Sequence, residues 1–85
     1  MNQNYKIKIS KNALKFINKQ DIQKKTRILS AIYGLPKGDV KKLKGYTEYY
    51  RLRVGDVRVV FTRNDKELLI LVIDIGNRGQ VYEEL

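Results

Sequence analysis

The sequence contains no cysteine and no histidine. The absence of cysteine excludes disulfides and thiolate metal sites, and the absence of histidine removes the commonest general base and metal ligand. A Ser-His or Cys-His nucleophile is therefore excluded. The carboxylates are scattered and match no calcium loop, and no glycine-rich phosphate loop is followed by a lysine. We accordingly expect no metal and no small-molecule cofactor.

Long hydrophobic runs are also missing. The longest apolar stretch covers only residues 68–73, whereas a membrane-spanning helix needs about 20 apolar residues. Residues 1–8 contain no continuous apolar segment, so a signal peptide is not expected and a cytoplasmic location is predicted. With 85 residues, of which 42% are hydrophobic, the chain is expected to form one domain over residues 1–85.

Positive charge dominates the chain, and its distribution is uneven. The formal net charge is +9. Residues 1–44 hold 11 of the 12 lysines, whereas residues 45–85 hold five of the six arginines. Lysine is a flexible point charge, and arginine is a planar fork suited to phosphate. The charge therefore predicts a polyanionic partner, which is either a nucleic acid or an acidic protein.

The N-terminal third reads as a strand followed by two helices. Apolar residues alternate with lysines over residues 5–9, which predicts a short strand. Ser10 and Asp21 are suitable N-caps for helices over residues 11–18 and 22–33. The expected inner face of the second helix consists of Ile22, Ile28, Leu29, Ile32 and Tyr33. A short joint between the helices predicts a helical hairpin.

Three β-type runs follow, at residues 49–54, 57–63 and 68–75, after a basic loop at residues 37–47 that leads into the first run. The order β-α-α-β-β-β predicts an α+β fold. In this fold an antiparallel sheet carries the N-terminal helical hairpin on one face.

Gly55 and Asp56 separate the first two of these runs and suit a type II′ hairpin turn. That turn places Arg53 opposite Arg58 and Arg51 opposite Val60. One face of the hairpin is then apolar, and the other carries Tyr49, Arg51, Arg53, Arg58, Val60 and Thr62. A shift of one residue would put the arginines into the core, so the register is well determined.

Arg53 and Arg58 are thus like charges placed directly opposite each other, which is destabilising in a sheet. A phosphate between them would gain charge-assisted hydrogen bonds from both. A solvated sheet face with arginines is the simpler alternative. RNA supplies its own nucleophile, the 2′-hydroxyl, so arginines around a phosphodiester could promote cleavage by charge stabilisation. Tyr82 is the nearby group with an exchangeable proton, and Arg78 lies in a glycine-flanked loop.

The sequence resembles the RelE toxin family, within the RelE/ParE superfamily of toxin–antitoxin systems. The resemblance spans nearly the whole chain and rests on the motifs KLKG at residues 42–45, YRLRVGDVRVVF at 50–61, VIDIGNR at 72–78 and VY at 81–82. It implies a ribosome-dependent mRNA interferase that cuts mRNA in the decoding site without a metal. It also implies a cognate acidic antitoxin, in addition to the ribosome and mRNA, as partners.

The resemblance further implies a set of site residues. The expected catalytic residues are Arg51, Arg53, Arg58, Arg78 and Tyr82. Arg58 and Arg78 match arginines that contact the scissile phosphate, and Tyr82 matches a tyrosine that orients or activates the 2′-hydroxyl. Lys42, Lys44 and Tyr49 complete the expected RNA- and ribosome-binding set.

The chain departs from the family pattern where some RelE toxins have lysines, at Arg51 and Arg53, and where many relatives have histidine, at Asn77. A lysine can exchange a proton, whereas an arginine hardly can. Two alternatives follow from the same fold. One is a ParE-type inhibitor of DNA gyrase without nuclease activity, and the other is an inactive toxin relative that acts as a binding module.

Overall fold

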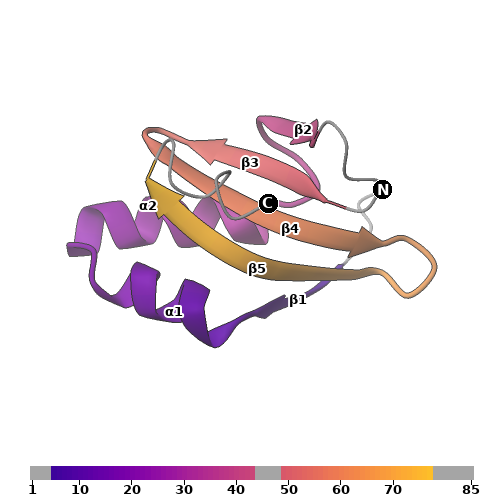
Figure 1. Cartoon of the computed structure of the whole chain (residues 1–85), viewed down its shortest axis with the longest axis horizontal. Helices are drawn as coiled ribbons and strands as arrows, with labels where there is room; N and C mark the ends of the chain where they lie inside the picture. Colours follow the sequence, from indigo (N-terminus) through magenta and orange to yellow (C-terminus); the bar gives the residue numbers. More distant parts are fainter. Residues whose placement is uncertain (1–4, 44–48, 78–85) are drawn as a thin grey trace.

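The computed structural model describes residues 5–43 and 49–77. Two helices precede most of the strands along the chain (Figure 1). The elements in chain order are β1 (Lys6–Ile9), α1 (Lys11–Asn18), α2 (Ile22–Tyr33), β2 (Val40–Lys42), β3 (Tyr50–Val54), β4 (Val57–Asn64) and β5 (Leu69–Asn77). The predicted α+β fold, with its N-terminal helical hairpin, is confirmed.

Both helices begin where their caps predict. The Ser10 hydroxyl accepts a hydrogen bond from the Ala13 backbone N–H at 3.2 Å, and the Asp21 carboxylate accepts one from Lys24 at 2.8 Å. Each cap satisfies one of the backbone N–H groups that a helix N-terminus leaves without a partner. The helix bounds inferred from the sequence are therefore correct.

The inner face of α2 is narrower than the sequence predicted. Ile28 and Ile32 are fully buried, whereas Ile22 is 75% exposed and Tyr33 is 63% exposed. Successive residues turn by about 100° around a helix. Ile22 and Tyr33 therefore lie more than a quarter-turn away from the line through Ile28 and Ile32, and their side chains face solvent.

The five strands form one sheet in the order β1-β5-β4-β3-β2. Two details differ from the sequence prediction. First, β1 runs parallel to β5, so the sheet is mixed rather than fully antiparallel. Second, residues within the expected loop at 37–47 form the edge strand β2, which pairs Val40 with Leu52. Three residues are too few to display the alternation that identifies a strand.

The helices cover one face of the sheet. In Figure 1 the strands pass in front of α2, so the viewer looks onto the opposite face. The core lies between the layers and includes Ala13 and Ile17 from α1, Ile28 and Ile32 from α2, and Leu52, Val59, Phe61, Ile70 and Val72 from the sheet. We call the sheet face that is turned away from α1 and α2 the open face. No helix in residues 5–43 and 49–77 is long and apolar enough to cross a membrane.

Candidate functional site

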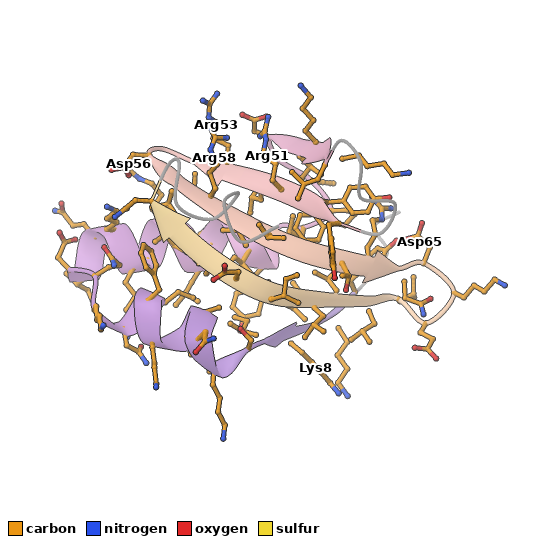
Figure 2. The ribbon with its side chains drawn as sticks, viewed as in Figure 1. Lys8, Arg51, Arg53, Asp56, Arg58 and Asp65 are labelled. Atoms are coloured by element: carbon orange, nitrogen blue, oxygen red, sulfur yellow. The ribbon has the colours of Figure 1, made fainter. Side chains whose placement is uncertain are left out.

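The β3–β4 hairpin sets the geometry of the open face. Gly55 has a φ of 60° and Asp56 keeps a negative φ, which is the pattern of a type II′ turn. The strands pair Arg53 with Arg58, Arg51 with Val60 and Tyr50 with Phe61. The register predicted from the turn is therefore confirmed at every pair, and the three arginines share the open face (Figure 2).

The adjacent strand β5 extends this pattern into two rows across the sheet. The first row holds Arg53, Arg58 and Gly76, and the second holds Arg51, Val60 and Asp74. Val60 is fully buried even though it lies on the open face. Its neighbours on this face are Arg51 and Asp74 on either side and Arg58 two residues away along β4.

Asp74 reaches this face because β5 carries a bulge. Val60 pairs with Asp74, but the next residue, Phe61, pairs with Val72, so Ile73 is an extra residue. Ile70 and Val72 point into the core, and strict alternation would have sent Asp74 there as well. The bulge turns Asp74 to the open face instead. Nothing in the sequence marks this position, and the sequence analysis missed Asp74 as a site residue.

Arg51 is held by a residue that the sequence analysis also missed. Its Nη1 donates to the Asp39 main-chain oxygen at 3.0 Å and to the Asp39 carboxylate at 3.3 Å. The same main-chain oxygen accepts a hydrogen bond from the Arg53 backbone N–H at 3.0 Å. The Arg51 side chain is only 13% exposed. Asp39 directly precedes β2, and the pairing of this edge strand with β3 brings Asp39 beside Arg51.

The other two arginines differ in exposure. Arg53 is exposed, whereas Arg58 is half-buried and its Nε atom is buried. Figure 2 shows Arg53 and Arg58 close together, with Arg51 beside them at the same edge of the sheet. In residues 5–43 and 49–77, no three His, Cys, Asp or Glu side chains gather so that they could hold a metal ion. The arrangement is suited to binding an anion through arginine.

The expected RNA-binding residues are only partly brought together. Tyr49 lines a hollow of about 520 Å³ on the open face, together with Thr62 and Leu71. Lys42 pairs with Tyr50, whose ring packs against the core, so Lys42 does not share the face of the arginines. Its neighbour Lys41 pairs with Arg51 and takes that place. The predictions for Lys44, Arg78 and Tyr82 fall outside the described residues.

A second cluster of charge lies at the other end of the sheet, where Figure 2 labels Asp65. Tyr5 donates to the Asp65 carboxylate at 2.7 Å, and Arg63 donates to the same group at 2.9 Å. The Arg63 guanidinium also lies 5.7 Å from the ring centroid of Tyr50. The hydrogen bonds from Arg63 and Tyr5 lower the pKa of Asp65 below its ordinary value of 3.8. These contacts tie β1, β3 and the β4–β5 turn together.

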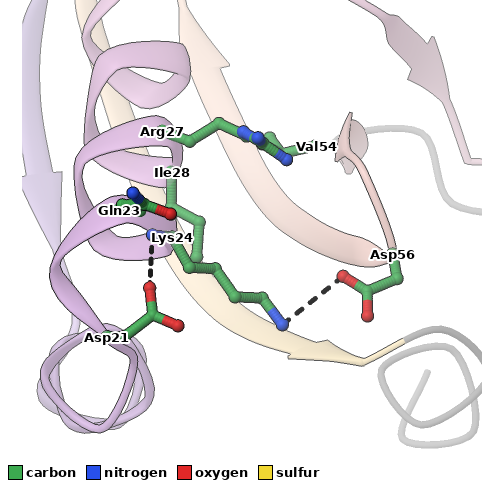
Figure 3. A pocket seen from close by; sticks show the side chains of 7 residues that line it. All are labelled: Asp21, Gln23, Lys24, Arg27, Ile28, Val54 and Asp56. Atoms are coloured by element: carbon green, nitrogen blue, oxygen red, sulfur yellow. Dashed lines mark hydrogen bonds and ion pairs between the residues drawn. The ribbon is translucent and has the colours of Figure 1, made fainter.

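A smaller pocket of about 250 Å³ lies between α2 and the β3–β4 turn (Figure 3). Lys24 forms an ion pair with Asp56 across it at 3.5 Å, and Arg27 and Val54 line it. Both charged partners are partly exposed, so the pair adds little stability. The pocket faces the helix side and is separate from the open face.

Comparison with known proteins reveals structural relatives. No protein-family model and no curated protein matches the sequence. The chain is 30% identical to RelE in the archaeal RelE–RelB complex from Pyrococcus horikoshii OT3, with a TM-score of 0.73 over 93% of this chain and 100% of that one.

Two further solved structures are similar. The RelB–RelE complex from Methanococcus jannaschii shares 27% identity, with a TM-score of 0.71 over 92% of this chain and 98% of that one. A mutant of the E. coli toxin RelE in the free state shares 22% identity, with a TM-score of 0.69 over 96% of this chain and 94% of that one. This last likeness shows the fold alone.

Proposed function

The chain belongs to the RelE family of type II toxins, and on that premise we propose that it is a ribosome-dependent endoribonuclease that cleaves mRNA in the decoding site. One observation carries the proposal. Three arginines surround the buried Val60 on the open face, with Arg51 directly opposite Val60 and Arg58 two residues away on the same strand. A phosphodiester bound by these side chains would lie between positive charges on two strands.

The proposed chemistry uses the nucleophile of the RNA itself. The 2′-hydroxyl attacks the adjacent phosphorus, and negative charge accumulates on the phosphate oxygens in the transition state. Guanidinium groups fixed around those oxygens stabilise this charge most where water is excluded. Arg51 and Arg58 are largely shielded from solvent, so both are suited to this role. Arg53 is exposed and is suited to binding an adjacent phosphate, while Arg78 and Tyr82 are proposed to complete the site.

The experiment is a reconstituted translation reaction with a defined mRNA, in which 5′ ends are mapped by primer extension. We expect cuts only on ribosome-occupied message. Arg58→Ala should lower the cleavage rate by about 100-fold or more, because it removes a donor to the phosphate. Arg27→Ala is the matched control, since Arg27 is exposed on α2 beside the pocket on the helix side.

The outcome separates the candidate activities. Equal cleavage by wild type and Arg58→Ala would contradict the role of the arginine face. Absence of cuts from a protein that is folded by circular dichroism would contradict the nuclease proposal as a whole. A supercoiling assay would then test inhibition of DNA gyrase, and unimpaired growth on strong expression would indicate an inactive relative.

We also propose a cognate acidic antitoxin as the physiological partner. The relatives from Pyrococcus horikoshii and Methanococcus jannaschii were each solved as complexes with RelB. The net charge of +9 would attract an acidic segment that folds on binding. Co-purification from the native operon tests this, and recovery of the toxin alone would contradict it.

A further inference from the structure

The proposed reaction lacks a proton acceptor among the arginines. Attack by the 2′-hydroxyl requires that its proton leaves, and a guanidinium stays protonated and only donates hydrogen bonds. The chain has no histidine and no cysteine that could take the proton, and a phenol such as that of Tyr82 carries a proton of its own and is suited to orienting the hydroxyl. The two rows of open-face residues that contain the arginines include one carboxylate, that of Asp74.

The bulge in β5 places Asp74 on the same face as the arginines, where a proton acceptor for the 2′-hydroxyl is needed. Adjacent strands lie about 4.8 Å apart, so the backbones of Arg51 and Asp74 are about 10 Å apart, with Val60 between them. Val60 is short and fully buried, so a phosphodiester on this part of the open face would meet the side chains that flank it, which are Arg51, Arg58 and Asp74. A ribose bound there would have an arginine on one side and the carboxylate on the other.

The carboxylate of Asp74 can also accept a further hydrogen bond from a substrate hydroxyl. Its Oδ1 accepts one hydrogen bond, from the Ile75 backbone N–H at 3.0 Å. Within residues 5–43 and 49–77 it forms no ion pair, although it lies on the arginine face. Asp39 is different, because its carboxylate is paired with Arg51. Asp74 is half-buried, and a partly dry site strengthens its interaction with a hydroxyl proton.

We propose that Asp74 is the general base of the cleavage reaction, an assignment that rests on the proposed function. Its carboxylate takes the proton of the 2′-hydroxyl as the O2′–P bond forms and the P–O5′ bond breaks. The upstream fragment ends in a 2′,3′-cyclic phosphate. The departing 5′ oxygen takes a proton from water and becomes a hydroxyl. Asp74 then returns its proton to the solvent, so the enzyme is unchanged.

Asp74→Asn tests the assignment, because it keeps the oxygen that accepts from Ile75 and removes the basic group. In single-turnover reactions on programmed ribosomes we expect cleavage to slow by about 100-fold or more. Binding of an mRNA with 2′-deoxyribose at the cut position should be unchanged or tighter, since a negative charge has left the arginine face. A purely structural role would weaken binding and cleavage together.

Glu67→Gln is the matched control, because it removes the same charge from the exposed β4–β5 turn, and both quantities should stay at the wild-type value. Asp74→Glu retains a carboxylate and should recover part of the rate. If Asp74→Asn does not fold, Asp74→Ser takes its place in the same comparison.

The two proposals fail in different ways. A wild-type protein that does not cleave contradicts the proposed function. A wild type that cleaves, together with an Asp74→Asn or Asp74→Ser variant that cleaves at the same rate, overturns the assignment of Asp74 alone. A folded variant that loses binding and cleavage equally also overturns it.

Discussion

The Nη1 of Arg51 donates hydrogen bonds to Asp39. Within residues 5–43 and 49–77, its Nε and Nη2 donate none. The edge formed by Nε and Nη2 can therefore bind a phosphate in the two-pronged manner that arginine favours. The main-chain oxygen of Asp39 holds Arg51 whatever the side chain is, so the carboxylate contributes mainly charge. That charge opposes an incoming phosphate.

The first prediction concerns this charge. Asp39→Asn should tighten binding of the 2′-deoxy-substituted mRNA on ribosomes by roughly two- to fivefold, because a partly exposed ion pair no longer competes with the phosphate. The dissociation constant at low and at physiological salt measures the effect. The gain should disappear in an Arg51→Ala background. A gain that persists there would show that the effect is general electrostatics rather than release of Arg51.

The cross-strand pair of Arg53 and Arg58 yields the second prediction. Arg53→Gln should raise the free energy of unfolding by about 0.5 kcal/mol, because it removes a like charge placed directly opposite another. It should also weaken mRNA binding. Chemical denaturation at low salt measures the stability, and the gain should shrink at high salt. Arg27→Gln on α2 is the control, and a loss of stability in Arg53→Gln would contradict the argument.

At the scale of elements, local signals predicted the fold well. Ser10 and Asp21 mark helix starts through bonds to residues three positions later, and Gly55 fixes a two-residue turn, so each signal acts within a few residues. The two helices and the register of β3 and β4 follow from these signals. The sequence also identified Arg51, Arg53 and Arg58 as neighbours, because alternation along a strand is a local property.

The features that escaped prediction depend on contacts between distant segments. The strand β2 is defined by its pairing with β3, and Asp39 reaches Arg51 across twelve positions. The bulge that turns Asp74 to the open face exists only when β5 pairs with β4. Asp39 and Asp74, the acidic residues of the candidate site, are therefore identified only by the structure, whereas the arginines were predicted from the sequence.

The third prediction concerns the contacts of Asp65 with Arg63 and Tyr5 at the β4–β5 turn. Asp65 has a lowered pKa because Arg63 and Tyr5 stabilise its charged form. A lowered folded-state pKa stabilises the fold above the ordinary value of 3.8, and this contribution is lost as pH falls through the folded-state value. Asp65→Asn should therefore lower the melting temperature at pH 7, and its difference from wild type should narrow below about pH 4.

Glu67→Gln serves as the control for Asp65→Asn, since Glu67 lies in the same exposed turn but outside the cluster with Tyr5 and Arg63. Its melting temperature should follow wild type more closely across this range. A difference for Asp65→Asn that stays constant between pH 7 and pH 3 would show that the cluster stabilises through packing rather than through the charge of Asp65.

At the scale of the whole molecule, positive charge is present on both sides of the sheet. Lys11 and Lys15 on α1 and Lys19 at its C-cap are spaced four residues apart, and all three are exposed. We call them the lysine stripe. Within the described residues none of them forms an ion pair. Like charges at this spacing destabilise a helix by a few tenths of a kcal/mol each. The stripe lies on the helix side, away from the arginines of the open face, so we expect it to contribute long-range attraction rather than contacts with a bound substrate.

The double variant Lys15→Gln/Lys19→Gln tests this division between attraction and chemistry. We expect slower association with ribosomes at low salt, because the field that draws the toxin to polyanionic RNA is weaker. The difference from wild type should vanish at high salt, where exposed charges are screened within about 10 Å or less. The cleavage rate of the bound complex should not change, because the stripe lies on the helix side and the arginines surround Val60 on the other face.

Stopped-flow association and single-turnover cleavage separate the two steps. Arg58→Ala should give the reverse result, with slow cleavage after nearly normal association. If the double variant slowed cleavage of the bound complex instead, the helix side would take part in holding the substrate in position.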